Sequence, residues 1–130
     1  MKRLVILYIV TFAVILPLDF LFLGVLAKDF FRSQVGDMLG TVRLAPAILF
    51  YLLYVVGILI FVSGNAATAQ TTLLYGALFG FFCYATYDLT NMATMKVWTL
   101  RVTLLDIAWG TILTGITASA GALVALRFAR

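Results

Sequence analysis

The chain has 130 residues, of which 65% are hydrophobic and only 11% are charged, and its mean hydropathy is +1.15. Soluble domains carry about a quarter charged residues, and a small soluble fold leaves too much surface in water to hide this much apolar area. The composition therefore predicts a membrane protein and excludes a soluble enzyme. The net charge of +4 does not indicate a nucleic-acid partner, because the nine basic residues stand at the ends of apolar runs.

The rarest residue types limit the chemistry. Histidine is absent and cysteine occurs once, at Cys83. The usual ligands of catalytic zinc, di-iron and haem sites are therefore missing, as is a Ser–His or Cys–His nucleophile pair. We expect no metal and no cofactor, and only a hard cation held by carboxylate and carbonyl oxygens stays compatible with the composition. A single cysteine does not indicate whether the protein works in an oxidising or a reducing compartment.

Four apolar runs follow one another, each near or above the roughly 20 residues that a helix needs to cross about 30 Å of hydrocarbon. Uninterrupted apolar runs predict helices rather than barrel strands. The first run is also too long for a cleaved signal peptide. The expected fold is an all-α membrane protein, with residues 1–130 forming one transmembrane domain of four helices in an up-down bundle. The runs cover about residues 4–27, 45–62, 71–95 and 102–126.

The first connection, residues 28–44, is charged and long enough for a short interfacial helix. Gly36 and Gly40 weaken such a helix, so an irregular loop is an equal alternative. The residues that would share its apolar face are Phe31, Val35, Met38 and Val42.

The orientation in the membrane depends on a nearly even charge distribution. Four basic residues fall at the end with the termini and five at the other end, which is almost no bias under the positive-inside rule. Lys2 and Arg3 favour both termini in the cytoplasm, and dual insertion is the alternative.

Three carboxyl groups interrupt the apolar runs, and the up-down order puts all of them in one half of the membrane. Asp19 lies about 12 Å below the rim, at about 1.5 Å per residue. Asp88 falls in the last third of the third run, and Asp106 lies one turn into the fourth. A charged Asp at the centre of a span costs about 2.5–3.5 kcal/mol, so these side chains are not expected to face lipid. The same half contains Tyr51, Tyr54, Tyr84, Tyr87, Asn91, Trp98 and Trp109.

Helical spacing groups the polar and small residues into faces. Tyr84, Asp88 and Asn91 share one face of the third run, and Gly76 and Gly80 extend it. Small residues let a neighbouring helix approach closely, and we expect Gly76, Gly80 and Gly110 to pack in this way. Two further stripes are Thr11, Ile15 and Asp19 in the first run, and Asp106, Gly110, Thr114, Thr117 and Gly121 in the fourth.

Two interpretations of the polar half compete. In the first, it is a structural cluster that holds the helices together and in which every polar group has a partner. The carboxyl groups would then bond to Tyr and Asn or pair with Arg43, Lys96 or Arg101 at the rim. Alternatively it is a ligand site, because ionisable residues inside a membrane are functional candidates by default. The two Trp side chains also suit interfacial anchors. The candidate ligand-binding residues are Asp19, Tyr84, Tyr87, Asp88, Asn91, Asp106 and Trp109.

The stretch GALFGFFCYATYDLTNMATMKVW, followed by VTLLDIAWGT, is similar to domain-of-unknown-function family 2177, a family of bacterial predicted membrane proteins. The Asp in PLDFLFLG and the run AILFYLLYVVGILIF agree more loosely. The resemblance implies a small four-helix protein of the bacterial inner membrane. It does not imply a particular reaction. The motif positions are Tyr87, Asp88, Leu89, Thr90, Asn91, Trp98, Asp106 and Trp109.

Three functions follow from this reading, and whether the protein is an enzyme stays open. The first is a polar pocket that binds or processes a lipid-phase or small polar ligand, with an Asp as general acid or base in any reaction. The second is a non-catalytic subunit or scaffold of a lipid-modifying complex, either as a homodimer or beside a membrane enzyme. The third is proton-coupled export in the manner of small multidrug resistance transporters, with Asp19 exchanging a proton for a cation.

Overall fold

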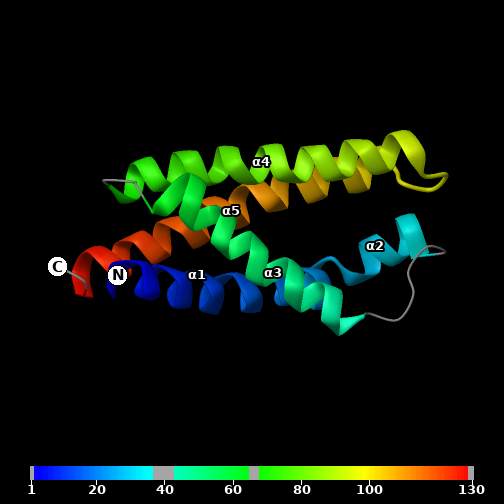
Figure 1. The fold of residues 1–130 in the computed structure, drawn as a ribbon. Coiled ribbons are helices and arrows are strands. Elements are labelled where there is room, and N and C mark those ends of the chain that lie inside the picture. Colours follow the sequence, from blue (N-terminus) through cyan, green and yellow to red (C-terminus); the bar gives the residue numbers. More distant parts are fainter. Residues whose placement is uncertain (1, 37–42, 65–67, 129–130) are drawn as a thin grey trace.

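The computed structural model describes residues 2–36, 43–64 and 68–128, and all the regular elements in these ranges are helical (Figure 1). The all-α prediction is therefore confirmed. The long helices are α1 (Lys2–Leu21), α3 (Leu44–Ile58), α4 (Ala69–Thr94) and α5 (Leu100–Phe128). Two π-helical turns, η1 (Phe22–Leu26) and η3 (Leu59–Ser63), extend α1 and α3, and a short helix, α2 (Lys28–Val35), follows η1.

Helix α2 decides between the two alternatives for the first connection. Lys28–Val35 is helical, with Val35 buried and Phe31 partly buried on its inner side. Thr99, just before α5, donates a hydrogen bond to the Gln34 side chain at 2.9 Å. Met38 and Val42, which were expected on the same face, lie outside the described residues.

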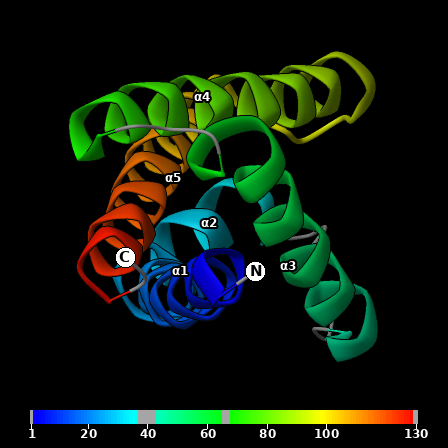
Figure 2. The ribbon, with the colours of Figure 1, turned by 60° about the vertical axis from the view of Figure 1, so that its left-hand side comes forward.

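The long helices alternate in direction, as the up-down prediction requires. In Figure 1 the start of α1, the end of η3, the start of α4 and the end of α5 lie at one end, and α2 and the connection from α4 to α5 lie at the other. Helix α5 is central, because it packs along α4 on one side and along α1 on the other (Figure 2). The stripe of α1 that turns inward consists of Leu7, Thr11, Ile15 and Asp19.

Glycines bring the backbones of α4 and α5 together. A Cβ atom on Gly80 would lie 2.7 Å from the Cβ atom of Thr114, and one on Gly76 would lie 3.0 Å from the Thr114 carbonyl oxygen. A Cβ atom on Gly110 would overlap the ring of Tyr84. All three glycines predicted to pack therefore lie in this one interface. A Cβ atom would overlap its neighbours at Gly80 and Gly110 and would be tightly packed at Gly76.

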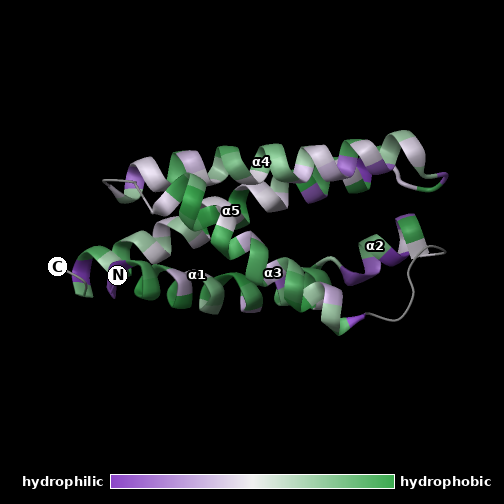
Figure 3. Cartoon of the chain, viewed as in Figure 1, coloured by the Kyte–Doolittle hydropathy of each residue, from purple (hydrophilic) through white to green (hydrophobic). Residues whose placement is uncertain are grey.

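Apolar side chains cover the outside of the bundle, and hydrophilic residues lie towards its two ends (Figure 3). Three helical segments of the described chain are long and apolar enough to cross a membrane: Lys2–Leu26, Leu44–Ser63 and Leu100–Phe128. They match three of the four predicted spans. Helix α4 occupies the remaining predicted span, but it is the least apolar of the long helices and is not one of these three segments.

Candidate functional site

Asp19 is anchored by donors from two other helices. Its side chain is 3% exposed. The Tyr51 hydroxyl of α3 donates to one carboxylate oxygen, and Trp109 Nε1 of α5 donates to the other at 2.8 Å. Phe22, in the π-helical turn that follows, stacks on the Trp109 ring with centroids 4.2 Å apart. Asp19 therefore ties α1, α3 and α5 together, and each of its oxygens has a partner.

Asp88 of α4 and Asp106 of α5 lie close enough for their carboxyl groups to interact electrostatically. Asp88 is fully buried and Asp106 is 8% exposed. Neither Asp88 oxygen has a hydrogen-bond partner among the described residues. An ionised carboxylate only accepts hydrogen bonds, so the two groups can bond only when one of them carries a proton. The pair can hold a shared proton or accept hydrogen bonds from an incoming donor.

Tyr84 and Asn91 lie on either side of Asp88 along the same face of α4, one turn away in each direction. The Tyr84 ring covers Gly110, close to Asp19 and Asp106. Asn91 Nδ2 is buried, and no acceptor in the described ranges bonds to it. Beside an acceptor-rich carboxyl pair, the site therefore also holds an unused amide donor.

Tyr87 is the candidate that the structure does not bring to the carboxyl groups. Its side chain is 58% exposed and meets Trp98 edge-on, with centroids 6.0 Å apart. The sequence placed Tyr87 at the correct depth along α4, but its side chain points to the outer face. Trp98 Nε1 is itself buried and has no acceptor in the described part of the chain.

Basic side chains do not neutralise the buried carboxyl groups. Lys96 and Arg43 are exposed outside the helices, and Arg101 is exposed in the first turn of α5. No cationic group among the described residues bonds to either oxygen of Asp88. The rim pairing considered from the sequence is thus not what satisfies Asp88. The site carries more acceptors than donors.

Tyr51 and Tyr54 complete the cluster, although they were not among the candidate site residues. The Tyr54 hydroxyl and Thr114 Oγ1 are 2.6 Å apart, and the Tyr54 ring meets Tyr84 edge-on. The sequence signal was available in their three-residue spacing, which puts both phenols on one face of α3 at the depth of Asp19.

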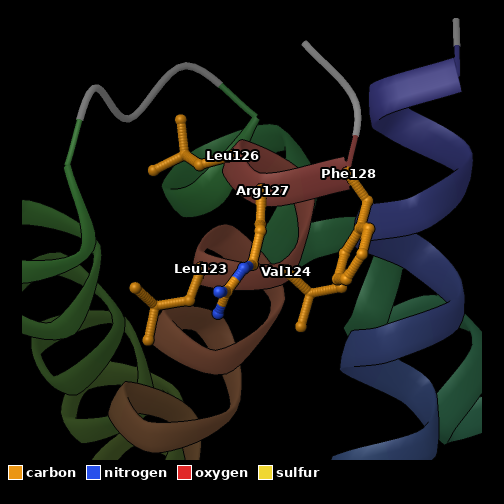
Figure 4. A pocket seen from close by; sticks show the side chains of 5 residues that line it. All are labelled: Leu123, Val124, Leu126, Arg127 and Phe128. Atoms are coloured by element: carbon orange, nitrogen blue, oxygen red, sulfur yellow. The ribbon is translucent and has the colours of Figure 1, made fainter.

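Two surface hollows lie at the far end of the bundle. One is formed by the last turns of α5, and its lining side chains point in different directions around the helix end (Figure 4). The other lies between the start of α4 and the end of α5, beside Thr68 and Ser119. Neither contains a buried carboxyl group, so the carboxyl cluster remains the candidate site. The first hollow is lined by Leu123, Val124, Leu126, Arg127 and Phe128.

Long antiparallel helices with apolar outer faces and a buried acidic cluster define a polytopic helical membrane protein. A family model described as a predicted membrane protein (DUF2177) matches residues 4–123, and the chain belongs to that family. The match includes all three clustered aspartates. No curated protein and no solved structure matches the chain.

Proposed function

We propose that α4 also crosses the membrane, so that residues 1–130 form a single four-span domain. At about 1.5 Å per residue, its 26 residues extend over roughly 39 Å, more than the hydrocarbon thickness. Its polar groups Asp88 and Asn91 face α5, and α4 packs along α5, which is itself a candidate span. The exposed face of α4 suits lipid, with Leu73, Leu74, Leu78, Phe81, Phe82 and Leu89.

Membrane-impermeant thiol labelling of intact bacterial cells tests this topology. In a Cys83→Ser background, Gln70→Cys and Lys96→Cys should react from opposite sides, because they flank α4 and are both exposed. Asp29→Cys on α2 should react from the same side as Lys96→Cys. We place the chain in the bacterial inner membrane with both termini in the cytoplasm, so Gln70→Cys should be labelled only after permeabilisation. Labelling of both α4 flanks from one side would refute the fourth span.

We infer that the Asp88–Asp106 pair binds a ligand that carries hydrogen-bond donors. The observation that carries this inference is the unmet hydrogen-bonding capacity of Asp88, which is fully buried, whereas both oxygens of buried Asp19 have donors. Unpaired buried polar groups are costly, and more so in hydrocarbon. A hydroxyl or amine group on the ligand would satisfy the acceptors.

The ligand class follows from the position of the site as well as from its chemistry. The cluster lies near one end of helices whose outer faces suit lipid, so both a small polar molecule and the polar head of a lipid can reach that depth. Asn91 Nδ2 offers one donor to an acceptor on the same ligand. In any reaction, the carboxyl pair would act as general acid or base, because it can hold and release a proton.

Native mass spectrometry of the protein purified in mild detergent tests ligand binding. We expect the wild type to retain a small molecule or lipid that Asp88→Asn loses, with occupancy falling at least roughly tenfold, equivalent to about 1.4 kcal/mol. The substitution keeps the shape of the side chain but replaces one acceptor oxygen with a donor. Asp29→Asn is the matched control, because Asp29 is exposed on α2, and it should retain the ligand. Equal retention by both variants would contradict the site.

The alternative functions make different predictions for the same residues. A scaffold for a lipid-modifying complex, working as a homodimer or beside a membrane enzyme, would tolerate Asp88→Asn and fail when its outer surface changes. A proton-coupled exporter would depend on Asp19. The two donors that occupy Asp19 favour an anchoring role for that residue, which supports the Asp88–Asp106 pair as the working site.

A further inference from the structure

Two N–H donors near the α2 end of the bundle are buried without a hydrogen-bond acceptor. They are Asn91 Nδ2 in the last turn of α4 and Trp98 Nε1 in the connection to α5, and neither is bonded within the described ranges. Asn91 lies roughly 4.5 Å nearer the rim than Asp88, at about 1.5 Å per residue, and Trp98 lies beyond the end of α4. Along the bundle axis, the unmet acceptors of Asp88 are therefore deepest, and the unmet donors lie between them and the rim.

These donors lie on a side of α4 that α3 leaves uncovered. Trp98 meets Tyr87 edge-on, and Tyr87 lies one helical turn before Asn91. One turn deeper on the same side, Tyr84 meets Tyr54 of α3. From that contact towards the α2 end, α3 diverges from α4 (Figure 1, Figure 2), and Tyr87 is exposed. A molecule in the bilayer can therefore approach Asn91 and Trp98 between α3 and α4.

A row of aromatic rings runs along the side where α3 faces α4. Phe50 stacks on Tyr54 with centroids 5.4 Å apart, and Tyr54 stacks on Phe79 of α4 at 5.8 Å. Phe79 in turn stacks on Phe61 of η3 at 5.9 Å. Phe50 and Phe61 are exposed, so the row forms part of the outer surface. In a bilayer, an extended acyl chain fits along such a row.

Basic side chains dominate the rim outside these donors. The described residues at this end expose five basic side chains and one acidic side chain, Asp29. Arg101 lies in the first turn of α5, roughly 7.5 Å along the axis from Asp106 at about 1.5 Å per residue. Clustered basic groups at a membrane surface attract anionic lipids. The basic residues are Lys28, Arg32, Arg43, Lys96 and Arg101.

The order of these groups with depth specifies a class of ligand. A phospholipid with its phosphate at the basic rim has its glycerol and ester groups on the side towards the hydrocarbon. In a two-chain phospholipid both of those glycerol oxygens are esterified, so no donor faces the carboxyl groups. A single-chain phospholipid keeps one free hydroxyl there, beside an ester carbonyl that accepts hydrogen bonds.

We propose that the ligand of the carboxyl pair is an anionic phospholipid with one acyl chain and a free glycerol hydroxyl. This proposal rests on the function proposed for the Asp88–Asp106 pair and names the class of its ligand. The hydroxyl donates to Asp88, and the ester carbonyl accepts from Asn91. Phosphate oxygens accept from Trp98 and bind Arg101, and the acyl chain lies along the aromatic row. Trp98 lies outside the helices, so its ring can turn aside to admit the lipid.

Native mass spectrometry of the full-length protein, with lysophosphatidic acid added after exchange of retained lipid for detergent, tests the proposal. This probe carries one chain, an anionic phosphate and one glycerol hydroxyl. We expect it to bind at least roughly tenfold more tightly than its 2-O-methyl ether, which lacks the donor, and than two-chain phosphatidic acid. Glycerol 3-phosphate, which has no chain, should not compete. Equal affinity for lysophosphatidic acid and its methyl ether would overturn the proposal, as would competition by glycerol 3-phosphate.

Matched variants check the contacts nearer the rim. Trp98→Phe keeps an aromatic ring and removes the N–H, so it should weaken lysophosphatidic acid binding roughly fivefold, the factor that corresponds to about 1 kcal/mol. Arg101→Gln should weaken binding at least as much. Arg127→Gln is its control, because Arg127 is exposed at the other end of α5, and it should bind as the wild type does. Wild-type affinity in both Trp98→Phe and Arg101→Gln would contradict the assignment.

The lipid class and the site itself fail on different results. A retained ligand that depends on Asp88 but is not displaced by lysophosphatidic acid would refute the lipid class and leave the site in place. Equal retention by the wild type and Asp88→Asn would refute the site.

Discussion

Replacing Gly80 with alanine should destabilise the protein by about 2–3 kcal/mol, the upper part of the range for overpacked cores. The added Cβ atom would press on the Gly110 carbonyl oxygen and would lie 2.7 Å from both Cβ and Oγ1 of Thr114. Backbone atoms cannot rotate away, so α4 and α5 must separate along their main contact. Separation would also disturb the Thr114 hydroxyl, which bonds to Tyr54.

Unfolding in mixed detergent micelles with increasing sodium dodecyl sulfate measures this loss. Gly57→Ala is the matched control, because its Cβ atom would meet the Phe79 ring at an ordinary contact distance of 3.4 Å. Alanine is a better helix former than glycine by about 0.8–1.0 kcal/mol, so the control should be neutral or slightly stabilised. Equal midpoints for the two variants would show that α4 and α5 do not touch at Gly80.

The sequence predicted the depth of the polar groups better than their rotation about the helix axes. Depth follows from counting residues along an apolar run, and Asp19, Asp88 and Asp106 all lie in the half that the count indicates. Rotation depends on which face meets a neighbouring helix. Tyr84 and Tyr87 have similar depths, yet Tyr84 covers Gly110 and Tyr87 is exposed.

Helical periodicity identified the faces where small or polar residues mark the contact. The stripe of Thr11, Ile15 and Asp19 is buried on α1 as its four-residue spacing indicates. Hydrophobic periodicity is weak in such helices, since the lipid-facing side is as apolar as the packed side. Glycine positions and polar residues therefore carried most of the predictive information.

The hydrogen-bond partner of each carboxyl group in the cluster could not be predicted from the sequence. Asp19 bonds to Tyr51 and Trp109, although the sequence offered at least as many reasons to pair the carboxyl groups with basic residues at the rim. The π-helical turn after α1 places the Phe22 ring in a stack on Trp109, and no residue pattern in the sequence predicts that turn. Such choices depend on how three helices meet, which local spacing does not encode.

Replacing Asp19 with alanine should cost about 3 kcal/mol of folding free energy. The change leaves the Trp109 N–H and the Tyr51 hydroxyl buried without their acceptor, and each unpaired group costs about 1–3 kcal/mol. Asp19→Asn should lose much less, because its carbonyl oxygen still accepts from Trp109 and its amide can donate to the Tyr51 oxygen. The Ala variant should also shift the fluorescence of Trp109, which loses its carboxylate partner.

The same micellar unfolding assay, with Asp29→Ala as an exposed control, checks this order of stabilities. If Asp19→Ala unfolded at the midpoint of Asp29→Ala, the two hydrogen bonds would contribute nothing and the anchoring role would be wrong. The comparison with Asp88 distinguishes a carboxyl group that stabilises the fold from one that binds the ligand. A carboxyl group that already has two donors should be needed for stability, and one without donors should be needed for binding. Asp19→Asn should therefore keep the retained ligand that Asp88→Asn loses, even though both replace a buried carboxylate with the same amide.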